Sequence, residues 1–292
     1  MLKQDFNQEL QRTHSTPHAA GEIACFDALI RALSKSHYVY VSRVHGNSGM
    51  VYHTIQHRPT TYGSKRCEIA DLLMFFISED EVRYTFMQNK RKRGICHNKN
   101  LTSESITLIQ WDLLHYKCTI SNASNKYNFP TKCLSSAVLD SVGTYGFFVN
   151  EIAGTVDMVY TIASDMNYSG MLNSINSRVV QINSNYNKVR NVRGYDEVEG
   201  TTDLDKFESA GFNMLIGTPL SAMIEENIEQ VNELLGIIKT CFKNQSDHKL
   251  ESLVDQFIAN NSINPIEPDA IICNVLIMDC SNSNTKFEKD RF

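Results

Sequence analysis

A single carboxylate interrupts an otherwise apolar stretch of the chain, and two polar residues close the stretch that follows it. Asp71 is the one polar side chain from Ile69 to Phe76. Burial of an ionised carboxylate is unfavourable unless a cation, a metal ion or hydrogen-bond donors accompany it. Gln88 and Lys90 end the next strand-like segment, and the two-residue period of a strand places both on one face. We therefore expect an acid, an amide and a lysine to meet near Asp71.

This set of side chains suits metal-assisted hydrolysis of a phosphodiester bond. Mg²⁺ prefers hard oxygen ligands and keeps several waters, so Asp71 would supply a charged ligand and the Gln88 carbonyl a neutral one. The ion polarises the phosphate and lowers the pKa of a bound water. Lys90 would orient that water or stabilise the charge that develops at phosphorus. The residues thus predict a nuclease that uses Mg²⁺ or Mn²⁺.

The elements that position these residues are predicted to form a β-hairpin. Residues 69–77 indicate a buried strand that contains Asp71, and the alternation over 82–90 indicates a second strand. Ser78 to Glu81 is typical of a short turn between them. Antiparallel pairing across this turn would bring Lys90 and Gln88 beside Asp71.

The rest of the chain alternates between predicted helices and strands, which indicates an α/β fold with a mixed central sheet flanked by helices. Glu22 begins an amphipathic helix that follows a helix entry at Thr16-Pro17. Residues 45–64 and 121–133 are expected to be mainly loops, and 167–200 give no clear pattern. Further strands are predicted at 38–41, 145–149, 156–162 and 271–279, and further helices at 103–115, 203–210, 221–242 and 250–258.

Asp71, followed by Gln88-x-Lys90 at the end of the next strand, resembles the PD-(D/E)xK nuclease superfamily in its QxK variant. The core of that superfamily, the restriction-endonuclease-like fold, combines a helical acid, an Asp on a strand and a strand that ends in (D/E)xK. The resemblance covers about residues 20–115 and implies that Glu22 is the helical acid, with Glu68 as a second auxiliary acid. It implies catalytic roles for all five residues and a metal ion held by Asp71, Gln88 and Glu22.

The resemblance implies a nuclease-like core in the N-terminal half, over residues 1–120. Residues 121–292 would add strands and helices to the same compact domain, because no Pro/Gly-rich linker separates the two parts. A looser similarity links residues 141–147 and 217–219 to nuclease-like proteins of bacterial anti-phage defence. The expected context is therefore defence against phage or foreign DNA.

The charge of the chain is divided unevenly. Residues 1–100 hold 14 Lys+Arg against 9 Asp+Glu, whereas residues 101–292 hold 14 against 24, within a net charge of −5. The basic run after Lys90 comprises Arg91, Lys92 and Arg93, which we expect to contact the phosphate backbone of DNA without reading its sequence. The acidic remainder is a candidate surface for a regulatory protein partner such as a helicase or sensor subunit.

Several other classes are disfavoured by the sequence. Eight cysteines without a CxxC pair speak against a disulfide scaffold or a zinc ribbon and favour a reduced, cytoplasmic location. The chain lacks an apolar run long enough to span a bilayer, a P-loop, a GxGxxG fingerprint and a GxSxG elbow. Two functions remain open: an active DNA endonuclease, or a catalytically degenerate nuclease-like subunit that binds DNA or protein in a defence complex.

Overall fold

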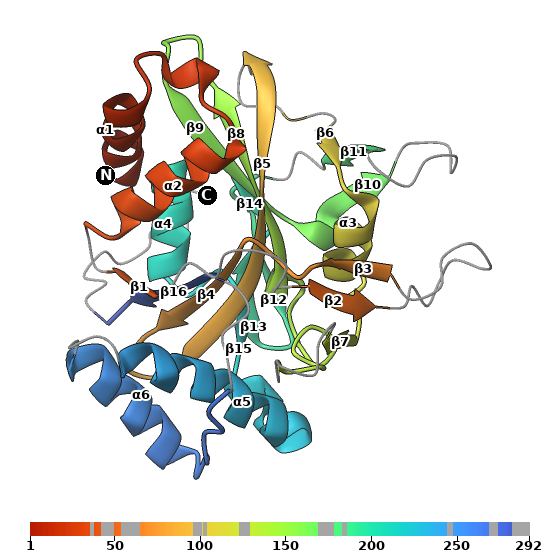
Figure 1. The fold of residues 1–292 in the computed structure, drawn as a ribbon. Coiled ribbons are helices and arrows are strands. Elements are labelled where there is room, and N and C mark those ends of the chain that lie inside the picture. Colours follow the sequence, from red (N-terminus) through yellow and green to blue (C-terminus); the bar gives the residue numbers. More distant parts are fainter. Residues whose placement is uncertain are drawn as a thin grey trace.

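A mixed β-sheet forms the centre of the computed structural model (Figure 1), which describes residues 1–35, 38–41, 50–53, 65–95, 101, 104–122, 129–168, 178–182, 186–243, 248–268 and 274–281. Within these residues the sheet has eight strands. Seven follow the order β1 (Tyr38–Val41), β16 (Asn274–Asp279), β4 (Leu72–Ile77), β5 (Val82–Ile95), β8 (Gly143–Asn150), β9 (Val156–Ile162) and β14 (Gly200–Thr201). The eighth, β15 (Thr218–Pro219), pairs with the start of β5.

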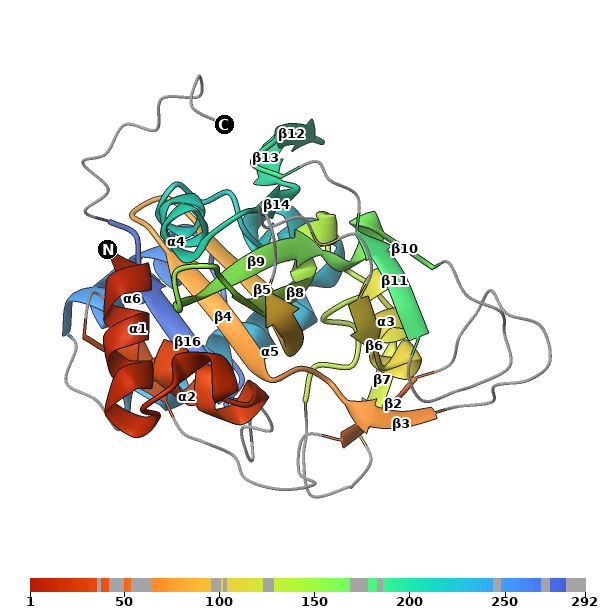
Figure 2. The ribbon, with the colours of Figure 1, turned by 90° about the horizontal axis from the view of Figure 1, so that it is seen from above.

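Helices cover both faces of this sheet, so the expected mixed α/β architecture is confirmed. The side chains of Leu72, Met74 and Phe76 in β4 pack with the helices of one layer, which are α1 (Leu2–Thr13), α2 (Glu22–Leu33) and α4 (Leu204–Phe212). The intervening side chains of β4 pack on the other side with α3 (Leu108–His115), α5 (Ile224–Phe242) and α6 (His248–Asn260). This alternation is the period of two that a strand buried on both faces requires. Figure 2 shows α1 and α2 side by side along one flank of the sheet.

The predicted hairpin is present, and it is followed by a crossover connection. β4 and β5 pair antiparallel from Ile77↔Val82 to Leu72↔Met87, and the backbone N–H of Ser78 donates to the carbonyl of Glu81 at 2.9 Å in the turn. The chain then passes through α3 and returns as β8, which pairs parallel with β5. Because β5 continues to Ile95 while β4 begins at Leu72, the second half of β5 extends beyond its β4 neighbour.

Short strands form three smaller sheets at the periphery. One contains β2 (Met50–His53), β3 (Lys65–Glu68) and β7 (Ile120–Asn122), a second β6 (Glu104–Ile106), β10 (Met166–Tyr168) and β11 (Arg178–Ile182), and a third β12 (Val189–Val192) and β13 (Tyr195–Val198). β2 and β7 therefore occupy parts of two segments that we expected to be loops. The helix expected over residues 103–115 begins later, because residues 104–106 form β6.

The strands predicted at 38–41 and 156–162 are found with those bounds as β1 and β9, and the remaining predicted elements are found with shifted boundaries. The long helix predicted from Ser221 begins with a 3₁₀ turn (Ser221–Met223) before α5, and Pro17–Ala19 forms a 3₁₀ turn ahead of α2. The predicted start of the last strand, residues 271–273, lies outside the described residues. Among the helices that the structure describes, none combines the length and the apolar character needed to cross a membrane.

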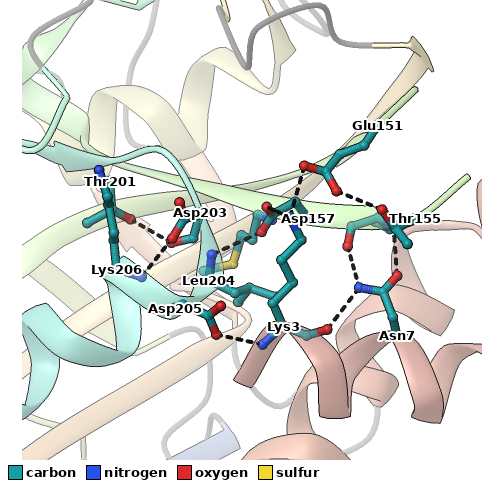
Figure 3. Close-up of polar contacts among 12 residues, drawn as sticks. Lys3, Asn7, Glu151, Thr155, Asp157, Thr201, Asp203, Leu204, Asp205 and Lys206 are labelled. Atoms are coloured by element: carbon teal, nitrogen blue, oxygen red, sulfur yellow. Dashed lines mark hydrogen bonds and ion pairs between the residues drawn. The ribbon is translucent and has the colours of Figure 1, made fainter. Parts of the chain in front are cut away.

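The N-terminal helix α1, which the sequence did not predict, is fixed to the sheet by polar contacts (Figure 3). The ammonium of Lys3 lies 2.8 Å from Asp157 Oδ2 and 2.9 Å from Glu151 Oε1. The side-chain amide of Asn7 donates to the Val156 carbonyl and accepts from the Val156 N–H. Asp157 Oδ1 in turn accepts the N–H of Leu204, the first residue of α4. One buried carboxylate thus joins α1, β9 and α4.

Candidate active site where β5 extends beyond β4

Asp71 lies in a bend directly before β4, not within the strand as we expected. Its Oδ2 accepts two hydrogen bonds, from the Asn89 N–H and from the Gln88 side-chain amide, each at 2.6 Å. The Asn274 side chain donates to the Asp71 carbonyl at 2.8 Å and so holds the bend against β16. The carboxylate therefore takes the position beside β5 that another residue of β4 would occupy if that strand were longer.

Gln88 is nearly enclosed, with 2% of its surface exposed, and its amide is fixed at both ends. Nε2 donates to Asp71, and Oε1 accepts from Gln110 Nε2 of α3 at 2.9 Å. The predicted contact between Gln88 and Asp71 is therefore confirmed. The Gln88 side chain, however, directs its NH₂ group, and not its carbonyl oxygen, at the Asp71 carboxylate. The predicted role of Gln88 as a metal ligand requires the amide to turn by half a rotation, with Gln110 turning in response.

Glu22 and Lys90 meet further along the same edge of β5. Glu22 is the first residue of α2, and its Oε1 lies 3.5 Å from Lys90 Nζ while its Oε2 accepts the Arg91 N–H at 3.2 Å. The Lys90 side chain is 18% exposed and that of Glu22 is 40% exposed. The acid expected on the first amphipathic helix therefore lies against the lysine of the QxK segment.

The electrostatics link three carboxylates to the same lysine. Burial raises the pKa of Asp71 to about 6, the charge of Lys90 opposes this rise, and Glu68 and Glu22 add to it. Burial also raises the pKa of Glu68, at the end of β3, and Lys90 again acts in the opposite direction. These influences indicate that Asp71, Glu68 and Glu22 share one region of negative potential around Lys90.

The residues present fit a hydrated divalent cation better than a fully protein-ligated one. No group of three His, Cys, Asp or Glu side chains in the described part of the chain is arranged to hold a metal ion. Asp71 Oδ1, however, has no hydrogen-bond partner among the described residues, and the surrounding carboxylates favour a cation. Mg²⁺ commonly binds through one or two carboxylates and keeps its remaining waters. Asp71, with Glu22 or Glu68, provides such a donor set.

The predicted basic run comprises Arg91, Lys92 and Arg93, and the contacts of Arg91 are the best defined. All five N–H donors of the Arg91 guanidinium go to neutral acceptors, which are the carbonyls of His18, Ala20, Lys92 and Phe148 and the side-chain oxygen of Asn150. Arg91 therefore ties the segment before α2 to the end of β8. The side chain of Arg93 lies outside the described residues.

A cavity of about 420 Å³ adjoins this strand end and extends the site away from Asp71. His18, Glu22, Arg91, Lys92 and Asn150 are among the residues that line it. Arg91 has no carboxylate ion-pair partner among the described residues, so its partly buried charge makes the cavity attractive to an anion. Lys92 of the basic run lines this cavity together with Glu22.

Comparison of the chain with models of protein families, with curated proteins and with solved structures gave no match. The chemistry of the site therefore rests on its own geometry.

Gln110 belongs to this site but was not predicted from the sequence. It is 8% exposed and interrupts the apolar stretch that begins at Leu108, as Asp71 interrupts the stretch before it. The same signal, a polar side chain in an apolar run, was therefore available. What the sequence does not give is its partner, because only the packing of α3 against the sheet brings Gln110 to Gln88.

Proposed function

We propose that this protein is a metal-dependent nuclease that hydrolyses phosphodiester bonds of DNA. The observation that carries the proposal is the gathering of Asp71, Glu22 and Lys90 at the part of β5 that extends beyond β4, while Glu68 and Glu22 both influence the pKa of Asp71. A structural core does not need three carboxylates around one partly exposed lysine. The chain order of acidic helix, hairpin, crossover helix and parallel strand is also compatible with the PD-(D/E)xK arrangement.

Each residue has a defined task in this proposal. Asp71, with Glu22 or Glu68, would hold Mg²⁺ or Mn²⁺, and the bound ion would supply a Lewis acid and a water of lowered pKa. Lys90 would place its ammonium group where negative charge develops on the phosphate. Gln88 fixes the orientation of the Asp71 carboxylate through its hydrogen bond.

The neighbouring cavity supports a polyanionic substrate. Lys92 and the partly buried Arg91 line it together with Glu22. A nucleic-acid strand that placed one phosphate at Lys90 would bring an adjacent phosphate toward these cations. Such contacts hold the backbone and carry no sequence information. A role in defence against phage or foreign DNA, under control of a protein partner, agrees with a nuclease that does not read sequence.

A degenerate, non-catalytic nuclease-like subunit is the second candidate, and one specific observation favours it. Asp71 Oδ2 is already engaged by two donors, and Gln88 directs its NH₂ group at the carboxylate. A site that held no metal would be stabilised by these contacts. In that case the same surface would bind DNA or a partner without cleaving it.

Cleavage of supercoiled plasmid by the intact protein in Mg²⁺ or Mn²⁺ tests the proposal. We expect Lys90→Ala and Asp71→Asn each to lower the rate by about 10²–10³-fold, and EDTA to abolish it. Lys243→Ala is the matched control, since Lys243 lies at the end of α5 and pairs with Glu267 outside the site. Equal rates for the wild type and both site variants would overturn the proposal. Plasmid binding without cleavage in either metal would favour the non-catalytic alternative over the active nuclease.

A further inference from the structure

Four separate segments of the chain converge around a second cavity, of about 510 Å³, that shares no lining residue with the candidate active site. Lys117 and Thr119 follow α3, Lys132 and Ser135 come from the segment before β8, Arg193 forms the tip of the β12–β13 hairpin, and Glu226 belongs to the first turn of α5. Figure 1 shows α5 at the foot of the molecule, away from α2. The cavity is within the size range of small-molecule sites.

The lining of this cavity carries an excess of positive charge. Three cations face one carboxylate, Glu226. Lys117 is paired with Asp140 at 2.9 Å, but neither Lys132 nor Arg193 has an ion-pair partner among the residues that the structure describes. Unpaired cations that share a concave surface raise the local potential and attract anions.

Two of these cations stand at positions where the backbone would favour another residue. Lys117 has φ of 48° just after the end of α3, a place where glycine or asparagine usually follows a helix. Arg193 has φ of 52° and precedes Gly194, with φ of 89°, in the two-residue loop of a hairpin, where asparagine, aspartate or glycine is usual. The local backbone therefore does not explain a basic side chain at either position, whereas the shared cavity does.

Hydroxyl groups complete the polar lining. Thr119 Oγ1 donates to Ser135 Oγ at 3.0 Å, and Ser136 Oγ donates to the Lys132 carbonyl at 2.7 Å. Hydroxyl hydrogens rotate freely, so these groups can donate to an anion as readily as to each other. Asn227, which also lines the cavity, interrupts α5 with non-helical φ and ψ of −140° and 39° and so opens the helix at this point.

We propose that this cavity binds a phosphate-bearing ligand through Lys117, Lys132 and Arg193. Phosphate combines the charge that the cations require with oxygen acceptors for the hydroxyl groups. No aromatic side chain is among the lining residues that we describe, so recognition would act on phosphates and not by stacking on a base. The source is either a phosphorylated small molecule or the backbone of a nucleic acid, which present the same group.

Isothermal titration of the intact protein in low salt with sodium tripolyphosphate, and separately with a short single-stranded oligodeoxynucleotide in EDTA, tests this site. We expect Arg193→Asn and Lys132→Gln each to weaken binding of at least one probe about fivefold or more. Asparagine suits the left-handed conformation at position 193, so the hairpin is retained. Lys243→Gln removes an equal charge outside the cavity and should bind as the wild type does.

The pattern of losses identifies the source of the phosphate. Weakened tripolyphosphate binding with unchanged oligonucleotide binding indicates a small phosphorylated ligand, and the reverse indicates a nucleic-acid backbone. Failure of the wild type to bind either probe, or binding by both cavity variants equal to that of Lys243→Gln, would overturn the proposal. Because Lys90→Ala leaves this cavity intact, it should retain binding here whatever its effect on cleavage.

Discussion

Asp71 and Glu22, from opposite ends of the segment that precedes β5, accept hydrogen bonds from N–H groups two residues apart on the same strand. Asp71 takes the N–H of Asn89, and Glu22 takes that of Arg91. The β4–β5 pairing ends at Leu72↔Met87, so these two carboxylates occupy the place of a strand that is missing from this side of β5. Where β5 extends beyond β4, two acids thus accept the backbone N–H groups of the residues on either side of Lys90.

The raised pKa of Asp71 predicts a pH-dependent effect of Asp71→Asn on stability. The folded pKa is about 6, above the ordinary value of 3.8, so ionisation opposes folding. The stabilising contribution of the protonated Asp71 carboxyl to the free energy of unfolding is fully present below pH 3.8 and is lost as the pH rises through 6. In EDTA at pH 8 we therefore expect Asp71→Asn to be more stable than the wild type by about 2 kcal/mol.

Urea unfolding at pH 4 and pH 8 measures this difference. The advantage of the variant should shrink toward zero at pH 4, where the wild-type carboxyl is protonated. Asp165, whose pKa burial also raises to about 6, titrates in both proteins and cancels in the comparison. An advantage that stayed the same at both pH values would show that the asparagine acts through packing and not through charge.

The Gln110–Gln88–Asp71 series predicts that Gln110→Glu will strengthen binding of Mn²⁺. At present Gln110 donates to Gln88 Oε1, which turns the Gln88 NH₂ group toward Asp71. A carboxylate at position 110 accepts and does not donate, so it would turn the Gln88 carbonyl toward Asp71 and the metal. We expect the dissociation constant for Mn²⁺ to fall by about tenfold, the scale of effects from residues that orient metal ligands.

Gln110→Leu separates orientation from charge, because it removes the donor without adding a carboxylate. It should leave Gln88 free to adopt either orientation, with Mn²⁺ affinity between those of the wild type and Gln110→Glu. Calorimetric titration of all three proteins at pH 8 provides the comparison. Equal affinities would exclude a role for the orientation of Gln88 in metal binding.

Much of the candidate site followed from the sequence, because its main determinants are local. The apolar run from Leu72 to Ile77, the turn at Ser78 and the alternation after Val82 predict the hairpin, and the hairpin brings Gln88 to Asp71. The orientation of the Gln88 amide did not follow, since it depends on Gln110, 22 residues away on another element. The bend at Asp71 likewise depends on Asn274, which is 203 residues distant.

The missed elements owe their structure to distant partners. α1 buries Leu2, Phe6 and Leu10, spaced four apart on one face, within a segment whose remaining residues are mostly polar. Its helix is stabilised by packing on α2 and by the contacts of Lys3 and Asn7 with β9, which no local pattern reveals. β14 and β15 have two residues each and exist as strands only through the longer strands with which they pair.

The contacts of Arg91 predict that Arg91→Lys will destabilise the fold more than it weakens nucleic-acid binding. A lysine retains the charge but cannot direct five donors to five acceptors in a fork. We expect a loss of about 2–3 kcal/mol in the free energy of unfolding. Lys92→Arg is the matched control, since it exchanges the same two residue types at the next position. Full stability of Arg91→Lys, with weaker oligonucleotide binding, would instead identify Arg91 as a phosphate contact.

The buried pair of Lys3 and Asp157 predicts that Lys3→Met will release α1 from the sheet. Asp157 has no exposed side-chain surface, and the substitution would remove the ammonium that lies 2.8 Å from its buried Oδ2. Burial alone would lower the pKa of Lys3, but the hydrogen bonds to Asp157 and Glu151 outweigh it and raise the pKa above its ordinary value. Because the Lys3 side chain is 27% exposed, we expect the free energy of unfolding, measured by urea titration, to fall by about 2 kcal/mol, less than for a fully enclosed pair.

Arg12→Met is the control, at a side chain that is 65% exposed on the same helix. It should change the free energy of unfolding by less than about 0.5 kcal/mol in the same urea titration. Equal effects of the two substitutions would mean that apolar packing, and not this ion pair, holds α1 in place.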